Sequence, residues 1–175
     1  MKAHVLDLSA YPRRAHFDYF RAMANPYAGV TVPVDLTDWM RRRRAQDLPF
    51  VLTFLHAVLQ AANAGPELRR RIRGDQIVEY DCCPASYTVA LPDGTYCYCT
   101  ADGGLPLARF LPLAQARQAE AVRRGVLAED EDSEACFFVS CLPWLSYTAL
   151  LQPTPSPADS NPRITWGKYR EYRPR

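Results

Sequence analysis

Two hydroxyl side chains lie in strongly apolar stretches of the sequence, where a polar side chain is a candidate functional group. Ser140 is part of the segment FFVSCLPW, and Thr165 is part of the segment RITWGKY. A hydroxyl held in such a strand can donate a hydrogen bond to an oxyanion that develops during acyl transfer. Loss of one such donor typically slows a reaction by about 10²-fold to 10³-fold. The residues leave one alternative open, which is a strand hydroxyl bonded to main chain.

Histidine is the side chain best suited to act as a general base near neutral pH. The sequence has three histidines, His4, His16 and His56. His4 falls in a terminal strand-like segment, and the other two fall on predicted helices, where a structural imidazole is equally compatible. The chain contains no Gly-x-Ser-x-Gly, no His-Glu-x-x-His and no glycine-rich phosphate loop. Residue types alone therefore identify no complete catalytic set.

The six cysteines stand at positions 82, 83, 97, 99, 136 and 141. Their spacing includes no Cys-x-x-Cys pair, and no His-x-x-x-His segment accompanies them, so no metal site is predicted. The first residues form no apolar signal segment, which predicts a cytoplasmic protein with reduced thiols. We expect the cysteines to behave as small buried hydrophobic residues.

Charge and hydropathy restrict the partners. Lys and Arg number 21 against 19 Asp and Glu, for a net charge of +2, which gives no indication of nucleic acid or of an anionic membrane. The arginine runs Arg41–Arg44 and Arg69–Arg71 are interpreted as solvated helix faces. The alternative is a phosphate-binding face, for which steep salt dependence of duplex binding would be diagnostic. The apolar stretch Phe50–Ala64 is too short, and too often interrupted by polar residues, to span a bilayer.

The periodicity of apolar residues predicts the helices and strands that position the two candidate hydroxyls. In the central core helix Leu52, Leu55, Leu59 and Ala62 fall at helical spacing before Gly65-Pro66. A hairpin is predicted across Pro92-Asp93-Gly94. The predicted helices are Pro12–Met23, Thr37–Arg44, Phe50–Ala64, Glu67–Arg73 and Pro106–Arg124. The predicted strands are Ala3–Leu8, Val30–Val34, Ile77–Tyr80, Tyr87–Leu91, Thr95–Thr100, Cys136–Leu150 and Arg163–Tyr172, with an acidic surface loop at 129–134.

Mixed helices and strands with one hairpin predict an α/β (α+β) two-layer sandwich, in which helices pack on a β layer. The length of 175 residues is enough for one domain to bury its own core.

Five ordered segments resemble the chloramphenicol acetyltransferase family. They are HFDYFR (16–21), VDLT (34–37), ELR (67–69), FFVSCLPW (137–144) and ITWGKY (164–169). The similarity runs from Tyr11 to Tyr169, and the S-x-L-P-W block at Ser140 is its most specific part. The resemblance implies the CoA-dependent acyltransferase fold, with a mixed β-sheet, as a single domain over residues 1–175.

The resemblance also implies a reaction. Family members transfer acetyl directly from acetyl-CoA to an acceptor hydroxyl of a small molecule, with a histidine base and without an acyl-enzyme or a permanently bound cofactor. Ser140 matches the serine that stabilises the tetrahedral oxyanion, and Thr165 matches the threonine that supports it through water. Members are homotrimers whose active sites lie between subunits, and the drug-modifying members confer antibiotic resistance.

The same resemblance assigns binding residues. Tyr19 and Phe20 match aromatic residues of the acceptor pocket, and Tyr96 is a further candidate there. Trp144 and Tyr169 match positions near the CoA arm. The acceptor pair reads Tyr-Phe here, whereas the drug-modifying members carry Phe-Tyr, and Pro49 replaces a lysine that contacts CoA in some members.

One family motif does not occur in the sequence. The base of the family sits in His-His-x-x-x-Asp-Gly, which follows the segment ending here at Tyr169 after one further strand, and these 175 residues contain no such motif. Arg13 matches an arginine that pairs with the aspartate of that motif. We therefore expect a domain that lacks its C-terminal strand and helix and is nearly inactive alone. The alternative is a non-catalytic homologue that acts as a binding or assembly subunit.

Overall fold

In the computed structural model the strands divide into two sheets, and the structure describes residues 1–128 and 133–171. The first sheet is antiparallel, in the order β1-β3-β2, and comprises β1 (Ala3–Val5), β2 (Arg70–Arg73) and β3 (Gln76–Tyr80). The second, in the order β5-β4-β6-β7, comprises β4 (Ala85–Ala90), β5 (Tyr96–Ala101), β6 (Phe137–Leu142) and β7 (Arg163–Gly167). Because β4 pairs antiparallel with β5 but parallel with β6, and β6 pairs parallel with β7, this second sheet is mixed.

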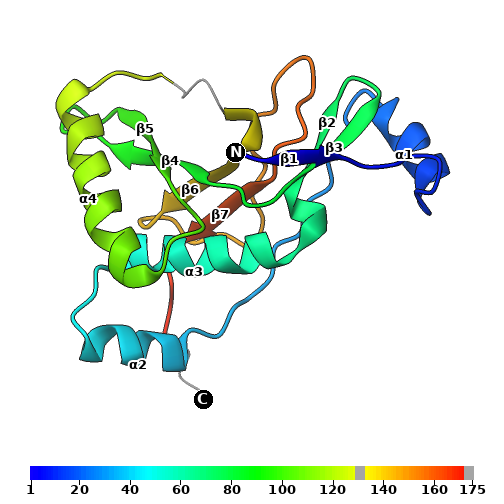
Figure 1. Cartoon of the computed structure of the whole chain (residues 1–175). Helices are drawn as coiled ribbons and strands as arrows, with labels where there is room; N and C mark the ends of the chain where they lie inside the picture. The colour runs from blue at the N-terminus through cyan, green and yellow to red at the C-terminus, as the bar shows by residue number, and fades with distance from the viewer. Residues whose placement is uncertain (129–132, 172–175) are drawn as a thin grey trace.

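The helices take different positions around the sheets (Figure 1). They are α1 (Arg14–Arg21), α2 (Thr37–Ala45), α3 (Phe50–Ala64) and α4 (Leu107–Arg124), with short 3-10 turns η1 (Pro66–Arg69) and η2 (Ser133–Ala135). Helices α3 and α4 pack against one face of the four-stranded sheet. Helix α1 lies at the end of the molecule that holds the β2–β3 hairpin, and α2 lies at the far side of α3 (Figure 1).

The core lies between α3, α4 and the four-stranded sheet. Leu55 and Leu59 of α3, Phe110 of α4, and Phe137 and Cys97 of the sheet are fully buried in it. Alternate residues of each strand point to opposite faces. This alternation therefore places the other set of side chains on the face that turns away from α3 and α4.

That second face is rich in hydroxyl groups. In β5 the residues Tyr96, Tyr98 and Thr100 alternate with the buried Cys97 and Cys99. The register pairs Thr88 of β4 with Tyr98, and further along the sheet it pairs Ser140 with Thr165. We call this the hydroxyl face, defined by Tyr96, Tyr98, Thr88, Ser140 and Thr165. The predicted sandwich of helices on a mixed sheet is confirmed, and one of its two sheet faces carries the candidate chemistry.

Several local predictions are confirmed. The hairpin joins β4 to β5 through a turn in which the Asp93 carboxylate accepts hydrogen bonds from the Thr95 amide and hydroxyl, at 2.9 Å and 2.7 Å. Gly94 has φ +86° in that turn, a conformation that favours glycine. The core helix occupies the predicted range Phe50–Ala64. All six cysteines are free thiols, and four of them are buried as expected, whereas Cys82 and Cys141 are only partly buried.

The predicted basic helix at Glu67–Arg73 is wrong. Its first half is the 3-10 turn η1, and Arg70–Arg73 form β2, which pairs with β3 across Gly74-Asp75. Gly74 has φ +59°. A Gly-Asp pair between two strands is a hairpin signal, and the ladder that it permits outweighs the weak helical pattern of a seven-residue segment.

Two predicted strands also differ from the structure. Val30–Val34 belongs to no helix or strand and has no ladder partner in the described ranges, and Val30 is 91% exposed. Its alternating pattern has no neighbouring strand, and Pro33 has no N–H to donate. Strand β6 ends at Leu142, because Pro143 lacks a donor and the Leu145 amide turns back to the Leu142 carbonyl at 3.0 Å. Most of the predicted acidic loop, residues 129–132, lies outside the described residues.

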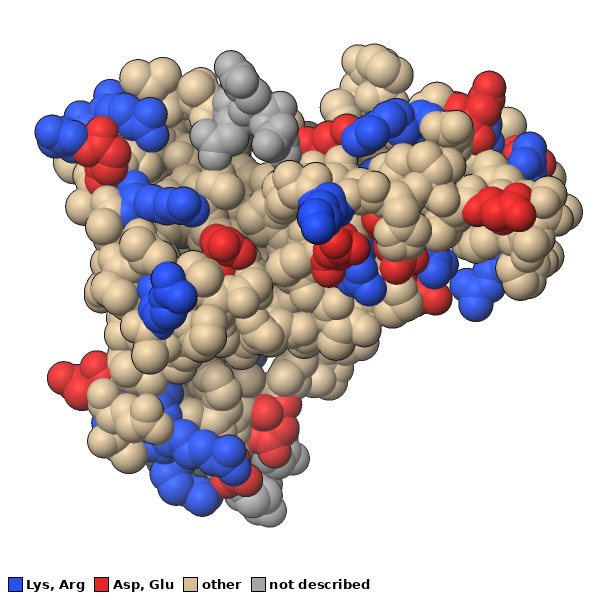
Figure 2. Space-filling view, viewed as in Figure 1, with Lys and Arg blue, Asp and Glu red and all other residues tan. Residues whose placement is uncertain are grey.

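No helix in the described ranges is both long and apolar enough to cross a bilayer. Figure 2 shows Lys and Arg side chains gathered over α2. The Arg41–Arg44 run on that helix is mostly exposed, and Arg41 pairs with Asp38 at 2.9 Å. The solvated-face interpretation is therefore right for this run. For Arg69–Arg71 it is wrong, since Arg71 is fully buried and Arg70 pairs with Glu79 at 2.9 Å.

Replacing Leu59 by alanine tests the position of the core. Leu59 is fully buried between α3 and the sheet, so the truncation loses transfer free energy and leaves a cavity. We expect a loss of about 2–5 kcal/mol of unfolding free energy in urea titrations. The matched change Leu113→Ala, on the half-exposed side of α4, is expected to stay within about 1 kcal/mol of wild type. Equal losses of unfolding free energy in the two variants would contradict the placement of the core between α3 and the sheet.

Candidate active site

The register of β6 and β7 brings the two candidate hydroxyls together. Val139 pairs with Ile164, Ser140 with Thr165 and Cys141 with Trp166 in a parallel ladder. Adjacent strands lie about 4.8 Å apart, so Ser140 and Thr165 are direct neighbours on one face. The Trp166 ring, on the opposite face, packs edge-on against Phe54 of α3 at 5.0 Å. Ser140 and Thr165 therefore point away from the helical layer.

The two hydroxyls differ in their hydrogen bonds. Thr165 Oγ1 accepts a hydrogen bond from Gln152 Nε2 at 2.6 Å. Ser140 Oγ makes no hydrogen bond to any residue of the described chain, and Ser140 is half-buried. The alternative of a strand hydroxyl bonded to main chain therefore does not describe Ser140. The arrangement offers one donor that is free and one that is fixed beside it.

The loop between β6 and β7 covers part of the hydroxyl face, and it contributes two residues that the sequence reasoning missed. Gln152 holds Thr165, and Tyr147 packs against Gly167. Burial raises the pKa of the Tyr147 phenol, and the nearby Thr165 hydroxyl offsets this only in part. Tyr147 is therefore a neutral phenol at physiological pH. Gly167, two residues after Thr165 in β7, is a sequence feature that could have indicated a close approach here, although the sequence reasoning did not use it.

The predicted acceptor residue Tyr96 lies on the same sheet face as Ser140, but on the edge strand β5. It pairs with Ala90, and its ring contacts that of Tyr98 at 5.7 Å. Strand β4 separates β5 from β6. Tyr96 thus shares a face with Ser140 without contacting it.

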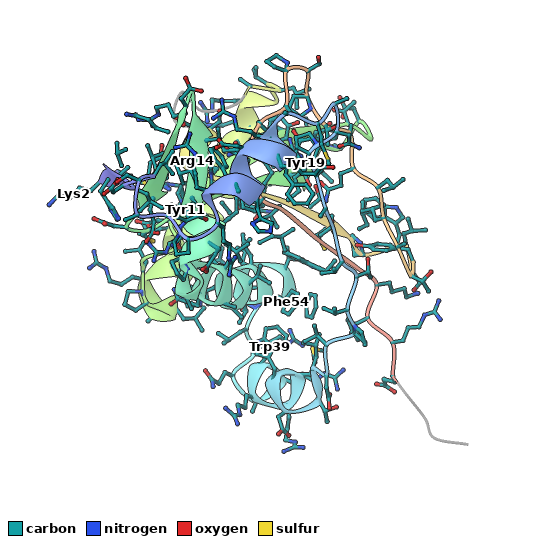
Figure 3. The ribbon with its side chains drawn as sticks, turned by 90° about the vertical axis from the view of Figure 1, so that its right-hand side faces the viewer. Lys2, Tyr11, Arg14, Tyr19, Trp39 and Phe54 are labelled. Carbon is teal, nitrogen blue, oxygen red and sulfur yellow. The ribbon has the colours of Figure 1, made fainter. Side chains whose placement is uncertain are left out.

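The structure does not bring Tyr19 and Phe20 to Ser140. Both lie on α1, with their rings edge to face at 5.3 Å, and Tyr19 is 66% exposed. An ion pair of 2.5 Å between Arg21 and Asp75 ties α1 to the β2–β3 hairpin. Phe20 lines a shallow hollow of about 250 Å³ beside this helix. Figure 3 shows Tyr19 on α1, well separated from the Trp39–Phe54 contact between α2 and α3.

The two residues predicted near the CoA arm flank one main-chain hydrogen bond. The Lys168 amide donates to the Leu145 carbonyl at 2.8 Å, so Trp144 and Tyr169 each lie one residue from this bond. Both are exposed, and the Tyr169 ring contacts Phe50 of α3 at 5.3 Å. The end of β7 and the start of the covering loop therefore present two aromatic side chains on adjacent segments.

The three histidines have other positions. His56 Nε2 is 2.8 Å from the Leu105 carbonyl oxygen, and its ring packs on Phe110. His4 lies in β1 and His16 in α1. No contact among the described residues places an imidazole against Ser140. The described ranges also hold no cluster of His, Cys, Asp and Glu suited to a metal ion.

The fold described above is shared by solved acyltransferase structures. One of these, described as a chloramphenicol acetyltransferase, superimposes with a TM-score of 0.79 over 98% of this chain and 84% of its own. The two are 22% identical, so this match establishes the CoA-dependent acyltransferase fold.

The sequence comparisons give the family. The family model for chloramphenicol acetyltransferase matches residues 1–172. Chloramphenicol acetyltransferases from Klebsiella sp and Escherichia coli are each 26% identical over 166 residues, which is 94% of this chain and 76% of each relative. The chain belongs to the chloramphenicol acetyltransferase family, a family of acyltransferase enzymes, and the resemblance stated from five segments is confirmed.

Gly167→Ala tests the close approach of the covering loop. A Cβ at this position would lie 2.5 Å from the Leu145 carbonyl oxygen and 2.8 Å from the Tyr147 ring, so loop or strand must move. We expect a loss of about 1–3 kcal/mol of unfolding free energy in urea titrations. Gly29→Ala is the control, because nothing lies within 4 Å of its Cβ position. If both variants unfold at the same urea concentration, the loop does not pack as described.

Proposed function

We propose that this protein transfers an acetyl group from acetyl-CoA directly to a hydroxyl of a small acceptor molecule, with no permanently bound cofactor. The observation that carries the proposal is the register pair Ser140–Thr165, in which the serine hydroxyl is free and half-buried. Membership of an acetyltransferase family supports the same conclusion. The catalytic roles of Ser140 and Thr165 are part of this proposal.

In the proposed reaction the acceptor oxygen attacks the thioester carbonyl and its proton leaves to a base. The carbonyl oxygen becomes an oxyanion, and the Ser140 hydroxyl donates a hydrogen bond to it. Collapse of the tetrahedral intermediate breaks the C–S bond and releases the CoA thiol. Gln152 already donates to Thr165 at 2.6 Å, so the Thr165 hydroxyl is oriented before the reaction begins. Such preorganised donors act on the charge that develops in the transition state.

Ser140 acts as a donor and not as a nucleophile in this proposal. A serine nucleophile needs an adjacent base to take its proton, and the described contacts place none of the three histidines against it. With none of the three histidines in contact with Ser140 among the described residues, we propose that loss of the acceptor proton is the slow part of turnover. A positioned base contributes about 10²-fold to 10⁴-fold, and we expect turnover by the chain alone to be slow by that factor.

The binding residues extend the proposal. Trp144 and Tyr169 are proposed to contact the CoA arm, since they flank the Leu145–Lys168 hydrogen bond at the end of β7. Tyr96, on the hydroxyl face, is proposed as an acceptor contact. Tyr19 and Phe20 can contribute only to an acceptor site completed by another subunit, because α1 holds them away from Ser140. The family resemblance leads us to propose a cytoplasmic homotrimer with sites between subunits as the assembly.

Ser140→Ala tests the oxyanion role. Thiol release from acetyl-CoA is measured with chloramphenicol as the first acceptor, at high protein concentration and with imidazole added as an external base. We expect imidazole to raise the rate of the wild-type chain, and Ser140→Ala to lower the stimulated rate by about 10²-fold to 10³-fold. Reactions without protein give the background acetylation of imidazole.

Ser146→Ala is the matched control, because the Ser146 hydroxyl accepts a hydrogen bond from Arg170 on the surface and has no proposed role. It should keep the wild-type rate. If the wild-type chain binds acetyl-CoA but gives no thiol release above background with or without imidazole, the alternative of a binding or assembly subunit is supported and acetyl transfer by this chain is rejected.

Tyr169→Ala tests the proposed CoA contact. The Tyr169 ring is half-exposed beside Phe50, so its removal takes away contact area for a ligand while leaving the core intact. We expect KM for acetyl-CoA to rise about 10-fold, equivalent to about 1.4 kcal/mol of binding energy, with little change in kcat. Tyr19→Ala, which removes a more exposed tyrosine on α1, should leave KM for acetyl-CoA unchanged. If KM for acetyl-CoA rises in Tyr19→Ala and not in Tyr169→Ala, the CoA site lies at α1 instead.

A further inference from the structure

Two buried polar side chains take no part in the proposed reaction. Arg71 of β2 is 0% exposed, and Asn161, just before β7, is 8% exposed. A buried charge or amide is costly unless each of its donors finds an acceptor. Their partners therefore show what these residues do.

Asn161 joins the chain before β7 to the chain before β6. Its Nδ2 group lies 2.9 Å from each of three main-chain carbonyl oxygens, those of Ser133, Glu134 and Cys136. The ladder pairs Phe138 with Arg163, and the same offset places Asn161 opposite Cys136. The side chain of Asn161 thus continues the contact between the two segments to a position two residues before the first ladder pair, Phe138–Arg163.

Arg71 holds the same carbonyl groups from β2. Its Nε donates to the Glu134 carbonyl at 2.9 Å, and its Nη2 donates to the carbonyls of Ala135 and Cys136 at 3.1 Å. Its Nη1 donates to the Leu68 carbonyl at 2.8 Å. The guanidinium also lies over the Phe137 ring. Two side chains from distant parts of the sequence therefore share the carbonyl oxygens of Glu134 and Cys136.

This arrangement fixes a register. Among the strands of the described residues, β7 is at the edge of the sheet and pairs only with β6. A slip of one residue between two strands moves every side chain of the slipped strand to the opposite face. Such a slip would turn Thr165 toward α3 and leave Ser140 beside a different side chain. Ser140 lies four residues after Cys136, and Thr165 lies four residues after Asn161.

We propose that Asn161 and Arg71 form a register clamp that positions Ser140 beside Thr165. The clamp is defined by these two side chains and the main-chain carbonyls of residues 133–136. Neither residue contacts the reacting atoms, so both are positioning residues. The catalytic meaning of the clamp rests on the proposed acetyl transfer, whereas its effect on the ladder does not.

Asn161→Ala, in the full chain, is the first test, with Asn63→Ala as its matched control. Asn63 also makes three hydrogen bonds to main chain, with Leu59 and Cys83 as partners, but it ties α3 to the segment before β4. Both variants lose an amide with three hydrogen bonds. They differ in whether those bonds hold the start of β6 to the start of β7.

The first readout is amide hydrogen exchange of the β6–β7 ladder, measured with global stability determined for each variant. We expect the amides at 139–141 and 164–166 to exchange about 10-fold faster in Asn161→Ala than in Asn63→Ala, after correction for global unfolding. Equal exchange in the two variants overturns the clamp. Should Asn161→Ala fail to fold, Asn161→Ser, which keeps one donor, takes its place with the same criterion.

The second readout is kinetic coupling to Ser140. With imidazole present, Asn161→Ala should lower kcat about 10-fold and leave KM for acetyl-CoA unchanged. In the Ser140→Ala background the same change should lower kcat no further, because the donor that it positions is gone. Asn63→Ala should have the same small effect in both backgrounds. Additive losses with Asn161→Ala overturn the positioning role.

The two readouts separate the proposals. If the wild-type chain has no transfer activity, the proposed function is rejected. Amide hydrogen exchange alone then tests whether the clamp holds the register. Arg71→Lys provides an independent check, since a lysine keeps the charge but lacks the planar five-donor fork with which Arg71 bonds the carbonyls of Leu68, Glu134, Ala135 and Cys136. It should speed exchange in the same ladder. Unchanged ladder exchange in this variant rejects the part of the proposal that concerns Arg71.

Discussion

The alternation of side chains in the four-stranded sheet is the constraint on which the other features depend. Cys97, Val139 and Phe137 must face α3 and α4, because burial of apolar surface there supplies the main driving force for folding. Once those residues are fixed, the intervening residues of the same strands can only face the other way. Ser140 and Thr165 therefore lie on the face that turns away from the helices, because their neighbours Val139, Cys141 and Trp166 occupy the core face.

Alternation fixes faces, but it does not fix how two parallel strands align along their length. That alignment is set at the start of β6, where the carbonyls of 133–136 converge on Arg71 and Asn161. A guanidinium bonded to several carbonyl oxygens is a way to bury a cation, because the carbonyl dipoles replace much of its lost hydration. This geometry explains why Arg71 can be fully buried. The Arg71 side chain also connects β2 of the first sheet to the main chain before β6 of the second sheet.

Local patterns predicted the elements whose stability is local. The helix at Phe50–Ala64 was predictable because its apolar spacing and its Gly-Pro stop lie within the segment itself, and the β4–β5 hairpin because its turn carries Asp93 and Gly94. The segment Glu67–Arg73 was mistaken for a helix because its strand character depends on pairing with β3. Val30–Val34 was mistaken for a strand for the converse reason, since an alternating pattern forms no ladder without a neighbour.

The sequence by itself determined the class of fold, the family, and the apolar segments that contain Ser140 and Thr165, because these are written in residue types and short spacings. Only the tertiary structure decided that Ser140 and Thr165 are neighbours, that Gln152 and Tyr147 accompany them, and that Tyr19 and Phe20 do not. Ser140 and Thr165 are 25 residues apart in the chain. Hydrogen bonds across such separations depend on how strands align in space, and no periodicity within either segment carries that information.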